Sequence, residues 1–378
     1  METPFIFGKL VSGDDFTNRF NEIIRLKNNF LSGVNTIIIS PRRWGKSSLV
    51  EKATLEILKE NNNIKIIAID LFNVRVEDDF YRILAEHVIR GTATKLQEVL
   101  AFTKKFFKQW IPRISFSPDN FQEFSLGLNW SEVKKQPDEI LDLPQQIAQA
   151  NGWKMIVCID EFQNIAFYHD PVAFQKQLRS HWQQHKSVSY CLFGSKRHML
   201  MHVFTSPSMP FYKFGDIMFL EKIATHDWEN YITRRFLATG KEIDPEQSGR
   251  IASLVDNHPY YVQQLAQLCW LRCDKKLTGE VIEQSLDSLT LQLSLLFQNL
   301  TESFSTTQVN YLRALINEET RFSSKETIQK YHLGTSANVS RIKKALIDKE
   351  IIDSLDGTGV FLDPVYKIWL KRYYFREL

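Results

Sequence analysis

The segment Thr36–Ser48 of this 378-residue chain, TIIISPRRWGKSS, decides the fold. It begins with a continuous β-branched run, Thr36–Ile39, which predicts a short strand buried on both faces of a sheet. A turn containing glycine follows, and a helical pattern begins at Ser47. A loop between a buried strand and a helix N-terminus presents backbone N–H groups and the positive end of the helix dipole to a phosphate. The segment therefore predicts a phosphate-binding loop in which Lys46 reaches the β- and γ-phosphates and the Ser47 hydroxyl binds Mg²⁺.

This loop departs from the usual GxxxxGK[ST] pattern at one position, because Ser40 stands where the pattern has its first glycine. Backbone amides can still form the phosphate cradle without that glycine. When the segment is taken alone, a plain Gly-Lys-Ser turn at a helix start remains an alternative. The residues assigned to nucleotide binding in the loop are Pro41, Arg42, Arg43, Trp44, Gly45, Lys46, Ser47 and Ser48.

A second apolar strand, Met155–Ile159, ends in two acidic residues, Asp160 and Glu161. A parallel strand beside the phosphate-loop strand is expected to bring Asp160 to the Mg²⁺ bound at Ser47. Glu161 then faces the γ-phosphate, where it orients or deprotonates the attacking water. Two carboxylates that end a buried strand cost free energy unless a metal or ligand accompanies them. Together the two motifs predict ATP or ADP with Mg²⁺ as cofactors, and an ATP hydrolase that uses Lys46 with these groups.

Strand and helix patterns alternate over the first part of the chain. The expected strands are Thr36–Ile39, Ile64–Leu71, Met155–Ile159, Ser189–Phe193 and Ile217–Leu220. Strands separated by helices form a parallel sheet with helices on both faces, so the predicted fold class is α/β, the P-loop NTPase type. Alternating apolar residues around Pro118-Asp119-Asn120 predict a β-hairpin inserted at about residues 112–130.

The pattern changes to helices after Ala224. Four helices are expected between Trp228 and Leu300, which predicts a helical lid. A winged helix-turn-helix is predicted next, from three helices and a hairpin: Thr306–Asn317, Ser324–Tyr331, Ser336–Lys349 and the turn Asp356-Gly357-Thr358-Gly359. The expected domains are the ATPase core over 1–224, the lid over 225–300 and the winged helix over 301–378.

Composition restricts the class of protein. The chain has 43% hydrophobic and 24% charged residues, which are ordinary globular values, and its net charge of +3 does not by itself indicate nucleic-acid binding. No run reaches the roughly 18 apolar residues that cross a bilayer, and the N-terminus lacks a signal-peptide pattern. The four cysteines form no CxxC pair. A reduced, cytoplasmic protein without a membrane span is expected.

Seven segments match the pattern of one known family: Phe7–Gly8, Phe16–Glu22, Pro41–Leu49, Ile159–Gln163, Phe193–Ser195, His258–Tyr261 and Leu362–Leu370. In them the chain resembles the archaeal-type ATPase family, AAA-like proteins close to the signal-transduction ATPases with numerous domains. The third and fourth segments are similar to the Walker A and Walker B motifs of that family. The resemblance implies a lid and a winged helix that open and close over the nucleotide, so that turnover is coupled to domain position.

The same resemblance implies roles for residues outside the two motifs. Asn18 and Arg19 would lie near the adenine and ribose, and Pro259 would approach the nucleotide from the lid. Ser195 would sense the γ-phosphate through its hydroxyl. Lys196 and Arg197, which follow it, are candidate cations for the phosphate charge, as are Arg42 and Arg43 of the loop. Each has a structural alternative. The alternative is a solvated helix start for Asn18 and Arg19, and a proline in the first turn of a helix for Pro259. For Ser195 it is a strand-end hydroxyl, and for Arg197 a surface cation.

The predicted function is an ATP-binding and ATP-hydrolysing regulatory switch or motor. Two alternatives stay open: a DNA-directed ATPase that uses the winged helix, and a nucleotide-binding scaffold with little turnover. Residues 336–349 are the candidate DNA-binding segment because they carry Arg341, Lys343, Lys344 and Lys349, although acidic residues follow them closely. A protein partner is also expected, and an oligomer is left open.

Overall fold

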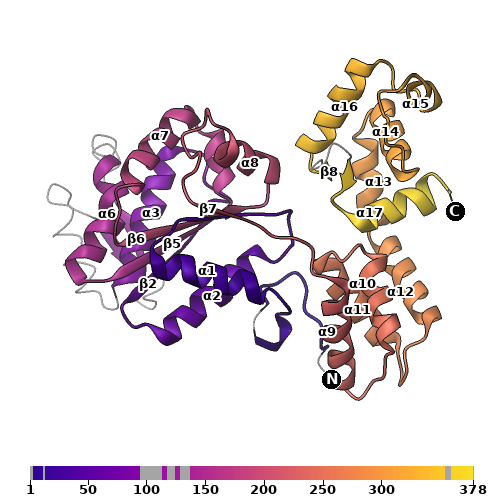
Figure 1. Ribbon diagram of the computed structural model, residues 1–378, viewed down its shortest axis with the longest axis horizontal. Coiled ribbons are helices and arrows are strands. Elements are labelled where there is room, and N and C mark those ends of the chain that lie inside the picture. The colour runs from indigo at the N-terminus through magenta and orange to yellow at the C-terminus, as the bar shows by residue number, and fades with distance from the viewer. Residues whose placement is uncertain are drawn as a thin grey trace. The chain divides into compact units, whose positions relative to one another are not determined.

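A computed structural model describes residues 3–11, 13–93, 113–116, 124–127, 137–353 and 359–377. The chain divides into two compact units (Figure 1). Residues Arg19–Glu221 form the unit that contains the large sheet, and Met1–Asn18 group with Lys222–Leu378 in a helical unit. The predicted domain boundaries near residues 224 and 300 stay predictions.

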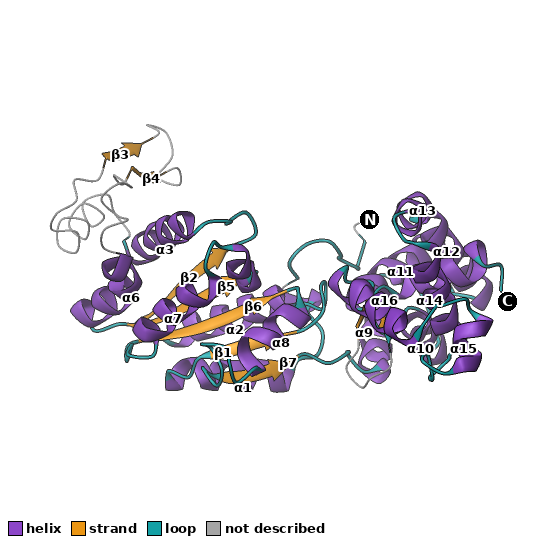
Figure 2. Cartoon of the chain, turned by 90° about the horizontal axis from the view of Figure 1, so that it is seen from above, coloured by secondary structure: helices purple, strands orange, loops and turns teal. Residues whose placement is uncertain are grey.

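The sheet unit is built on five strands: β1 (Thr36–Ile39), β2 (Ile64–Asp70), β5 (Lys154–Asp160), β6 (Val188–Gly194) and β7 (Asp216–Phe219). Their order is β2-β5-β6-β1-β7, and every neighbouring pair is parallel (Figure 2). The predicted fold class, an α/β protein with a parallel P-loop sheet, is confirmed. One detail of the prediction is wrong: β5 does not lie beside β1, because β6 pairs with both and separates them.

Helices cover both faces of this sheet (Figure 1). One face carries α1 (Phe20–Ser32) and α2 (Lys46–Glu60), and the other carries α3 (Glu77–Thr92), α6 (Pro137–Asn151), α7 (Pro171–Trp182) and α8 (Arg197–Thr205). Ile37 and Ile39 belong to the core cluster with residues of α3, α6, α7 and α8, whereas Ile38, which is also buried, does not. Successive side chains of a strand face opposite sides, so a strand buried on both faces is apolar at every position.

A second, smaller sheet consists of β3 (Arg113–Phe116) and β4 (Phe124–Gly127). The two strands pair antiparallel, with Arg113 opposite Gly127 and Phe116 opposite Phe124. This pairing is the one that a hairpin insert requires. The predicted turn residues 118–120 lie outside the described residues.

The helical unit begins after the sheet with α9 (Thr225–Leu237), α10 (Pro245–Leu254), α11 (Pro259–Arg272), α12 (Gly279–Gln292) and α13 (Ser294–Glu302). The last of the four expected helices is therefore two helices, divided at Leu293. The N-terminal segment, which includes the short helix η1 (Gly13–Asp15), packs into this unit. Phe5 is 1% exposed and contacts the rings of Tyr231 and Phe236.

The C-terminal part contains α14 (Thr306–Ile316), α15 (Lys325–Lys330), α16 (Ser336–Asp348), the antiparallel strands β8 (Ile352–Asp353) and β9 (Val360–Phe361), α17 (Pro364–Trp369) and the π-helix η3 (Leu370–Tyr374). The first three helices are preceded by the N-cap residues Ser305, Ser324 and Thr335, whose side chains accept hydrogen bonds from backbone N–H groups in the first turn. Such caps fix helix starts. In the described ranges, no helix is both long and apolar enough to span a membrane.

Candidate functional site

Three loops meet at one edge of the large sheet because parallel strands end on the same side. The phosphate-binding loop follows β1, Asp160 ends β5, and Ser195 directly follows β6. Since β6 lies between the other two strands, Ser195 stands between the loop and the acidic residues. Because β6 is the strand between β5 and β1, the hydroxyl of Ser195 is a polar group in the middle of the site.

The loop reaches the helix through an unusual backbone conformation. Gly45 has φ +85°, and an added Cβ there would meet no atom within 4 Å. Glycine is therefore required by its dihedral angle and not by lack of space. Arg43 also has positive φ, whereas Ser40 does not. The missing first glycine therefore causes no backbone strain at Ser40, which explains why the loop forms without it.

Lys46 lies inside this loop and is 6% exposed. Its ammonium group donates hydrogen bonds to the backbone carbonyl oxygens of Ser40, at 3.2 Å, and Pro41, at 2.8 Å. Phosphate oxygens can replace such acceptors and add opposite charge. The N-cap residue of α2 is Gly45, which has no side chain to cap the helix, and the first backbone N–H groups of a helix have no acceptor within the helix itself. The loop therefore fits an anion.

Ser47 and Asp160 join the loop to the acidic strand end. Ser47 Oγ donates a hydrogen bond to Asp160 Oδ2 at 2.8 Å, and the backbone N–H of Glu161 donates to Asp160 Oδ1 at 2.8 Å. Burial raises the pKa of Asp160 above its ordinary value, against the opposing effect of these two hydrogen bonds. A carboxylate that is costly to ionise without a cation is suited to bind one.

The donor set of Ser47 and Asp160 fits Mg²⁺. A hydroxyl and a carboxylate are the hard oxygen ligands that Mg²⁺ takes, and this ion usually keeps several waters and substrate phosphates among its ligands. No group of three or more His, Cys, Asp or Glu side chains that could hold a metal occurs in the described part of the chain. A two-residue site completed by nucleotide and water is therefore the kind of Mg²⁺ site that this edge can form.

Glu161 follows Asp160 in a left-handed backbone conformation, with φ +52°. Its Oε2 accepts a 3.0 Å hydrogen bond from the Ser195 hydroxyl and another from the side-chain amide of Gln163. Positive φ is rare outside glycine and turns the carboxylate out of the strand path. The Ser195 hydroxyl, expected to sense the γ-phosphate, donates to Glu161 in this structure.

The other loop residues differ in exposure. Arg42 and Arg43 are exposed, Pro41 and Ser48 are buried, and Trp44 is partly buried. The Trp44 indole nitrogen is enclosed and makes no hydrogen bond to any described residue. Their predicted roles in nucleotide binding stay predictions.

The residues implied by the family resemblance are divided between the two units. Asn18 donates to Asp227 Oδ2 of α9 at 2.6 Å, and Pro259 occupies the first turn of α11. Arg19 begins the sheet unit, where its guanidinium pairs with Glu22 at 3.0 Å. Arg197 places its guanidinium 5.9 Å from the centre of the Phe219 ring. Their proximity to a nucleotide stays a prediction.

Two residues of this edge were absent from the predicted set. Gln163 lies in η2 (Phe162–Phe167), is 1% exposed and contacts the Glu161 carboxylate. Gly194 ends β6, and an added Cβ there would overlap the Gln163 side chain. The sequence signals for them are a glutamine two residues after the acidic pair and a glycine directly before Ser195.

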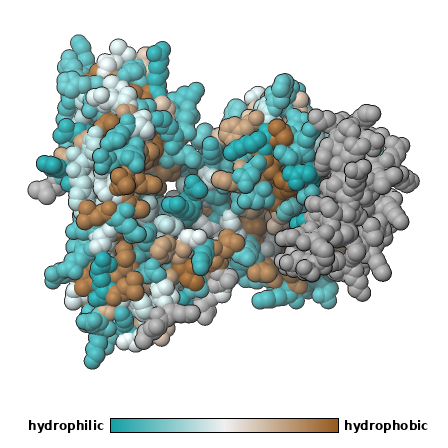
Figure 3. Space-filling view, turned by 180° about the vertical axis from the view of Figure 1, so that it is seen from behind, coloured by the Kyte–Doolittle hydropathy of each residue, from teal (hydrophilic) through white to brown (hydrophobic). Residues whose placement is uncertain are grey.

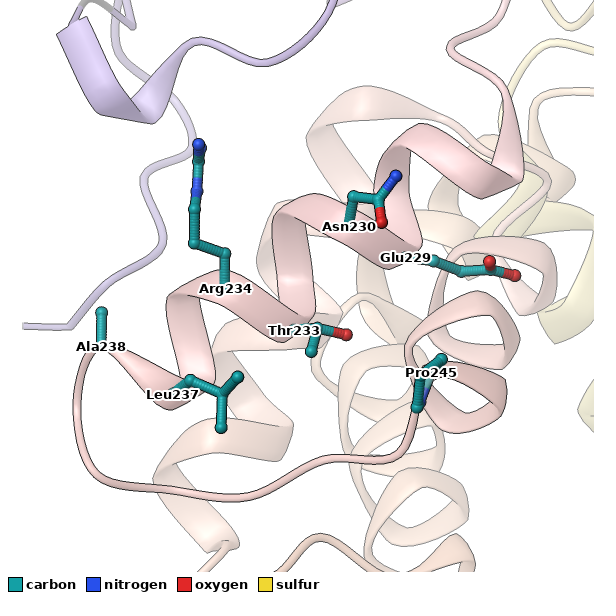
Figure 4. A pocket seen from close by; sticks show the side chains of 7 residues that line it. All are labelled: Glu229, Asn230, Thr233, Arg234, Leu237, Ala238 and Pro245. Atoms are coloured by element: carbon teal, nitrogen blue, oxygen red, sulfur yellow. The ribbon is translucent and has the colours of Figure 1, made fainter.

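A cavity of about 510 Å³ lies in the helical unit along α9 and the start of α10 (Figure 4). It is lined by Glu229, Asn230, Thr233, Arg234, Leu237, Ala238 and Pro245. None of these is a predicted site residue. Its lining mixes one acid, one base, two uncharged polar side chains and three apolar ones, so its chemistry does not favour one ligand class.

The fold and this edge define the class of the protein: it has the fold of the P-loop ATPases, with a winged helix domain at its C-terminus. A family model described as "Probable winged helix domain" matches residues 295–372. A search of curated proteins finds no match.

Solved structures share this architecture over almost the whole chain. The Walker-type ATPase PABY2304 of Pyrococcus abyssi is 18% identical, with a TM-score of 0.68 over 98% of this chain and 100% of that one. The ORC1 protein of Aeropyrum pernix, determined in complex with DNA, is 12% identical, with a TM-score of 0.50 over 99% of each chain. The expected resemblance to archaeal AAA-like ATPases with a winged helix is thus confirmed at the level of the fold.

Proposed function

We propose that this protein binds ATP with Mg²⁺ and hydrolyses it, as a regulatory switch or motor whose nucleotide state governs the lid and the winged helix. The observation that carries the proposal is the 2.8 Å hydrogen bond between Ser47 and Asp160. It joins the phosphate-loop helix to the acidic strand end, so one cation bound there would have both as ligands. The buried ammonium group of Lys46 adds a positive charge inside the same loop.

Four side chains at this edge have roles in the proposed reaction: Lys46, Ser47, Asp160 and Glu161. Lys46 and the first turn of α2 hold the phosphates, and Ser47 and Asp160 hold Mg²⁺, which neutralises charge on the β- and γ-phosphates when bound. Glu161 accepts a proton from the attacking water. The water oxygen bonds to the γ-phosphorus as the bond to the β–γ bridging oxygen breaks, which yields ADP and inorganic phosphate.

Phosphate release by the wild type and by Glu161→Gln tests the proposal. The variant keeps the shape of the side chain but loses the base, so ATP binding should persist while turnover falls by about 10²- to 10⁴-fold. Equal turnover in the two proteins would remove Glu161 from catalysis. Tightly retained nucleotide with negligible turnover in the wild type would instead support the scaffold alternative.

A DNA-directed ATPase is the second candidate, and the surface of α16 favours it. Ser336, Ser340, Arg341 and Lys344 are exposed along this helix, which follows α15 through a turn containing Gly334 at φ +85°. This is the arrangement in which a recognition helix enters the major groove. The A. pernix ORC1 protein, which shares the fold, was determined in complex with DNA.

Contact with a protein, whether a partner or a second copy, is supported by exposed apolar side chains. Figure 3 shows apolar residues gathered in patches among polar ones on one face. Among its described residues, the helical unit exposes six leucines by more than half of their surface: Leu10, Leu237, Leu271, Leu291, Leu295 and Leu296. Contiguous exposed apolar surface commonly marks interaction sites. We also propose that the protein is located in the cytoplasm.

A further inference from the structure

The carboxylate of Glu161 is held through one of its two oxygens. Oε2 accepts hydrogen bonds from the Ser195 hydroxyl, at 3.0 Å, and from Gln163 Nε2, and the Ser195 backbone N–H lies 3.5 Å away. A carboxylate offers two oxygens with about four lone-pair directions. Concentrating the donors on Oε2 fixes the rotation of the group, so the direction of Oε1 is determined as well.

The orientation of the Gln163 amide follows from this arrangement. An ionised carboxylate only accepts hydrogen bonds, so the NH₂ group and not the oxygen of Gln163 must face Glu161. Gln163 Oε1 is then enclosed without a hydrogen bond to any described residue. Leaving a buried amide oxygen unpaired costs free energy. Because Gln163 is buried despite this cost, we take the hydrogen bond from its NH₂ group to Glu161 as the contact that the site requires.

Gly194 makes room for this amide. Its Cα faces Gln163, and an added Cβ would overlap Gln163 Oε1 and lie 3.2 Å from Glu161 Cα. Gly194 does not have a positive φ, so its backbone conformation is open to alanine. The restriction at position 194 is therefore one of space, set first by the Gln163 side chain and then by the backbone of Glu161.

We infer that Gln163 is a positioning residue: its amide, together with Ser195, holds Glu161 Oε2 toward β6, so that Oε1 receives the proton of the attacking water. This inference rests on the proposed ATP hydrolysis. β6 lies on the side of β5 toward β1, so the hold directs the carboxylate toward the phosphate loop. Gln163 acts through Glu161 and does not itself exchange a proton with substrate.

Gln163→Leu tests this inference, since leucine fills the space without a donor. We expect kcat to fall about 10- to 100-fold, the effect of a misplaced catalytic group, with an unchanged KM and an unchanged affinity for ADP. Gln175→Leu is the matched control. Gln175 is also 1% exposed, and its Oε1 makes no hydrogen bond to any residue that the structure describes, but it lies in α7 and no hydrogen bond joins it to Glu161 among those residues. The control should change the melting temperature without changing kcat.

A second measurement needs no turnover. ADP with aluminium fluoride imitates the phosphoryl group in transfer, and groups that act in the transition state bind such analogues more tightly than the ground state. The affinity for ADP with aluminium fluoride relative to ADP should fall in Gln163→Leu and stay unchanged in Gln175→Leu. An unchanged ratio in Gln163→Leu, or a kcat above that of the wild type, would overturn the inference. Absence of hydrolysis in the wild type would overturn the proposed function instead.

Gly194→Ala supplies an independent route to the same contact. The alanine should displace Gln163 and lower kcat to a similar degree. In a Gln163→Ala background the overlap with the amide is gone and only the 3.2 Å approach to Glu161 Cα remains, so the second substitution should have a smaller effect than it has in the wild type. Such non-additivity reports a direct coupling. Fully additive losses would show that the two residues act separately and would contradict the inference.

Discussion

Ser47 and Asp160 are 113 residues apart in the sequence and share a 2.8 Å hydrogen bond. The two residues belong to different elements, the first turn of α2 and the end of β5, with one strand between β5 and β1. Side chains of these elements meet only because the sheet places both ends at one edge. Binding of a cation by both residues would therefore depend on the positions of the phosphate loop and of the end of β5 together.

Lys46→Ala is expected to weaken ATP binding by about 2–5 kcal/mol, because the variant removes a buried charge from the phosphate cradle. Isothermal titration calorimetry with ATP and Mg²⁺ measures the change in the binding free energy. Lys52→Ala is the control, since Lys52 lies in the same helix but is not in the loop. Wild-type affinity in Lys46→Ala would contradict the phosphate-loop assignment.

Asp160→Asn is expected to remove the Mg²⁺ dependence of nucleotide binding. Asparagine keeps the shape of the side chain and can accept one of the two hydrogen bonds that Asp160 accepts, from Ser47 or from the Glu161 N–H, but a neutral amide is a much weaker Mg²⁺ ligand than a carboxylate. Titrations with ATP in the presence of Mg²⁺ and of a chelator should therefore agree for the variant and differ for the wild type. A Mg²⁺ effect of wild-type size in Asp160→Asn would place the ion elsewhere.

The buried carboxylate also predicts a pH dependence of stability without nucleotide. Burial raises the folded-state pKa of Asp160 above its ordinary value of 3.8. The contribution of this group to the free energy of unfolding is therefore complete below the unfolded pKa and is lost as the pH rises through the folded pKa. The stability of Asp160→Asn relative to the wild type should therefore rise between pH 3.8 and neutral pH. Melting temperatures over a pH series measure this difference.

Glu139→Gln provides the control for that series, because Glu139 is an exposed carboxylate of α6 in the same unit. Its melting temperature relative to the wild type should not show the rise with pH that Asp160→Asn shows. If Asp160→Asn lost stability as the pH rose, the burial of Asp160 would have the opposite effect from the one inferred.

The strands and the phosphate loop could be predicted from the sequence because their signals are local. A β-branched run followed by Gly45, Lys46 and Ser47 is typical of a phosphate loop and of few other structures. Three serine and threonine caps indicate where the helices of the winged helix begin. The order of the strands could not be predicted in this way. Strands buried on both faces are apolar throughout, so nothing in β5 or β6 says which one pairs with β1.

The role of Gln163 shows a second limit. Its contact with Glu161 is close in sequence, but the space it occupies is left by Gly194 on the neighbouring strand. That relationship depends on the register between β5 and β6, which no local pattern encodes. The packing of Phe5 into the helical unit was missed for the same reason, because it joins residues more than 200 positions apart.

The winged helix predicts a specific response to salt if it binds duplex DNA. Lys344→Ala should weaken binding by a similar factor for all sequences and reduce the slope of log affinity against log salt by about 1. Fluorescence anisotropy with a labelled duplex measures both quantities. Lys276→Ala is the control, since Lys276 is exposed and pairs with Asp244 outside α16. Equal slopes for the wild type and Lys344→Ala would exclude a phosphate contact from this residue.

Phe5→Ala is expected to destabilise the helical unit by about 3–5 kcal/mol, the usual cost of deleting a buried aromatic side chain. Phe5 packs on Tyr231 and Phe236 of α9, so its loss leaves a cavity in the core of that unit and not in the sheet unit. Hydrogen exchange should accelerate across α9 to α11 while β1 and β5 keep their protection. Phe20→Ala removes a ring that is 71% exposed and should leave both regions unchanged. Faster exchange confined to the sheet strands would show that the N-terminal segment stabilises the other unit.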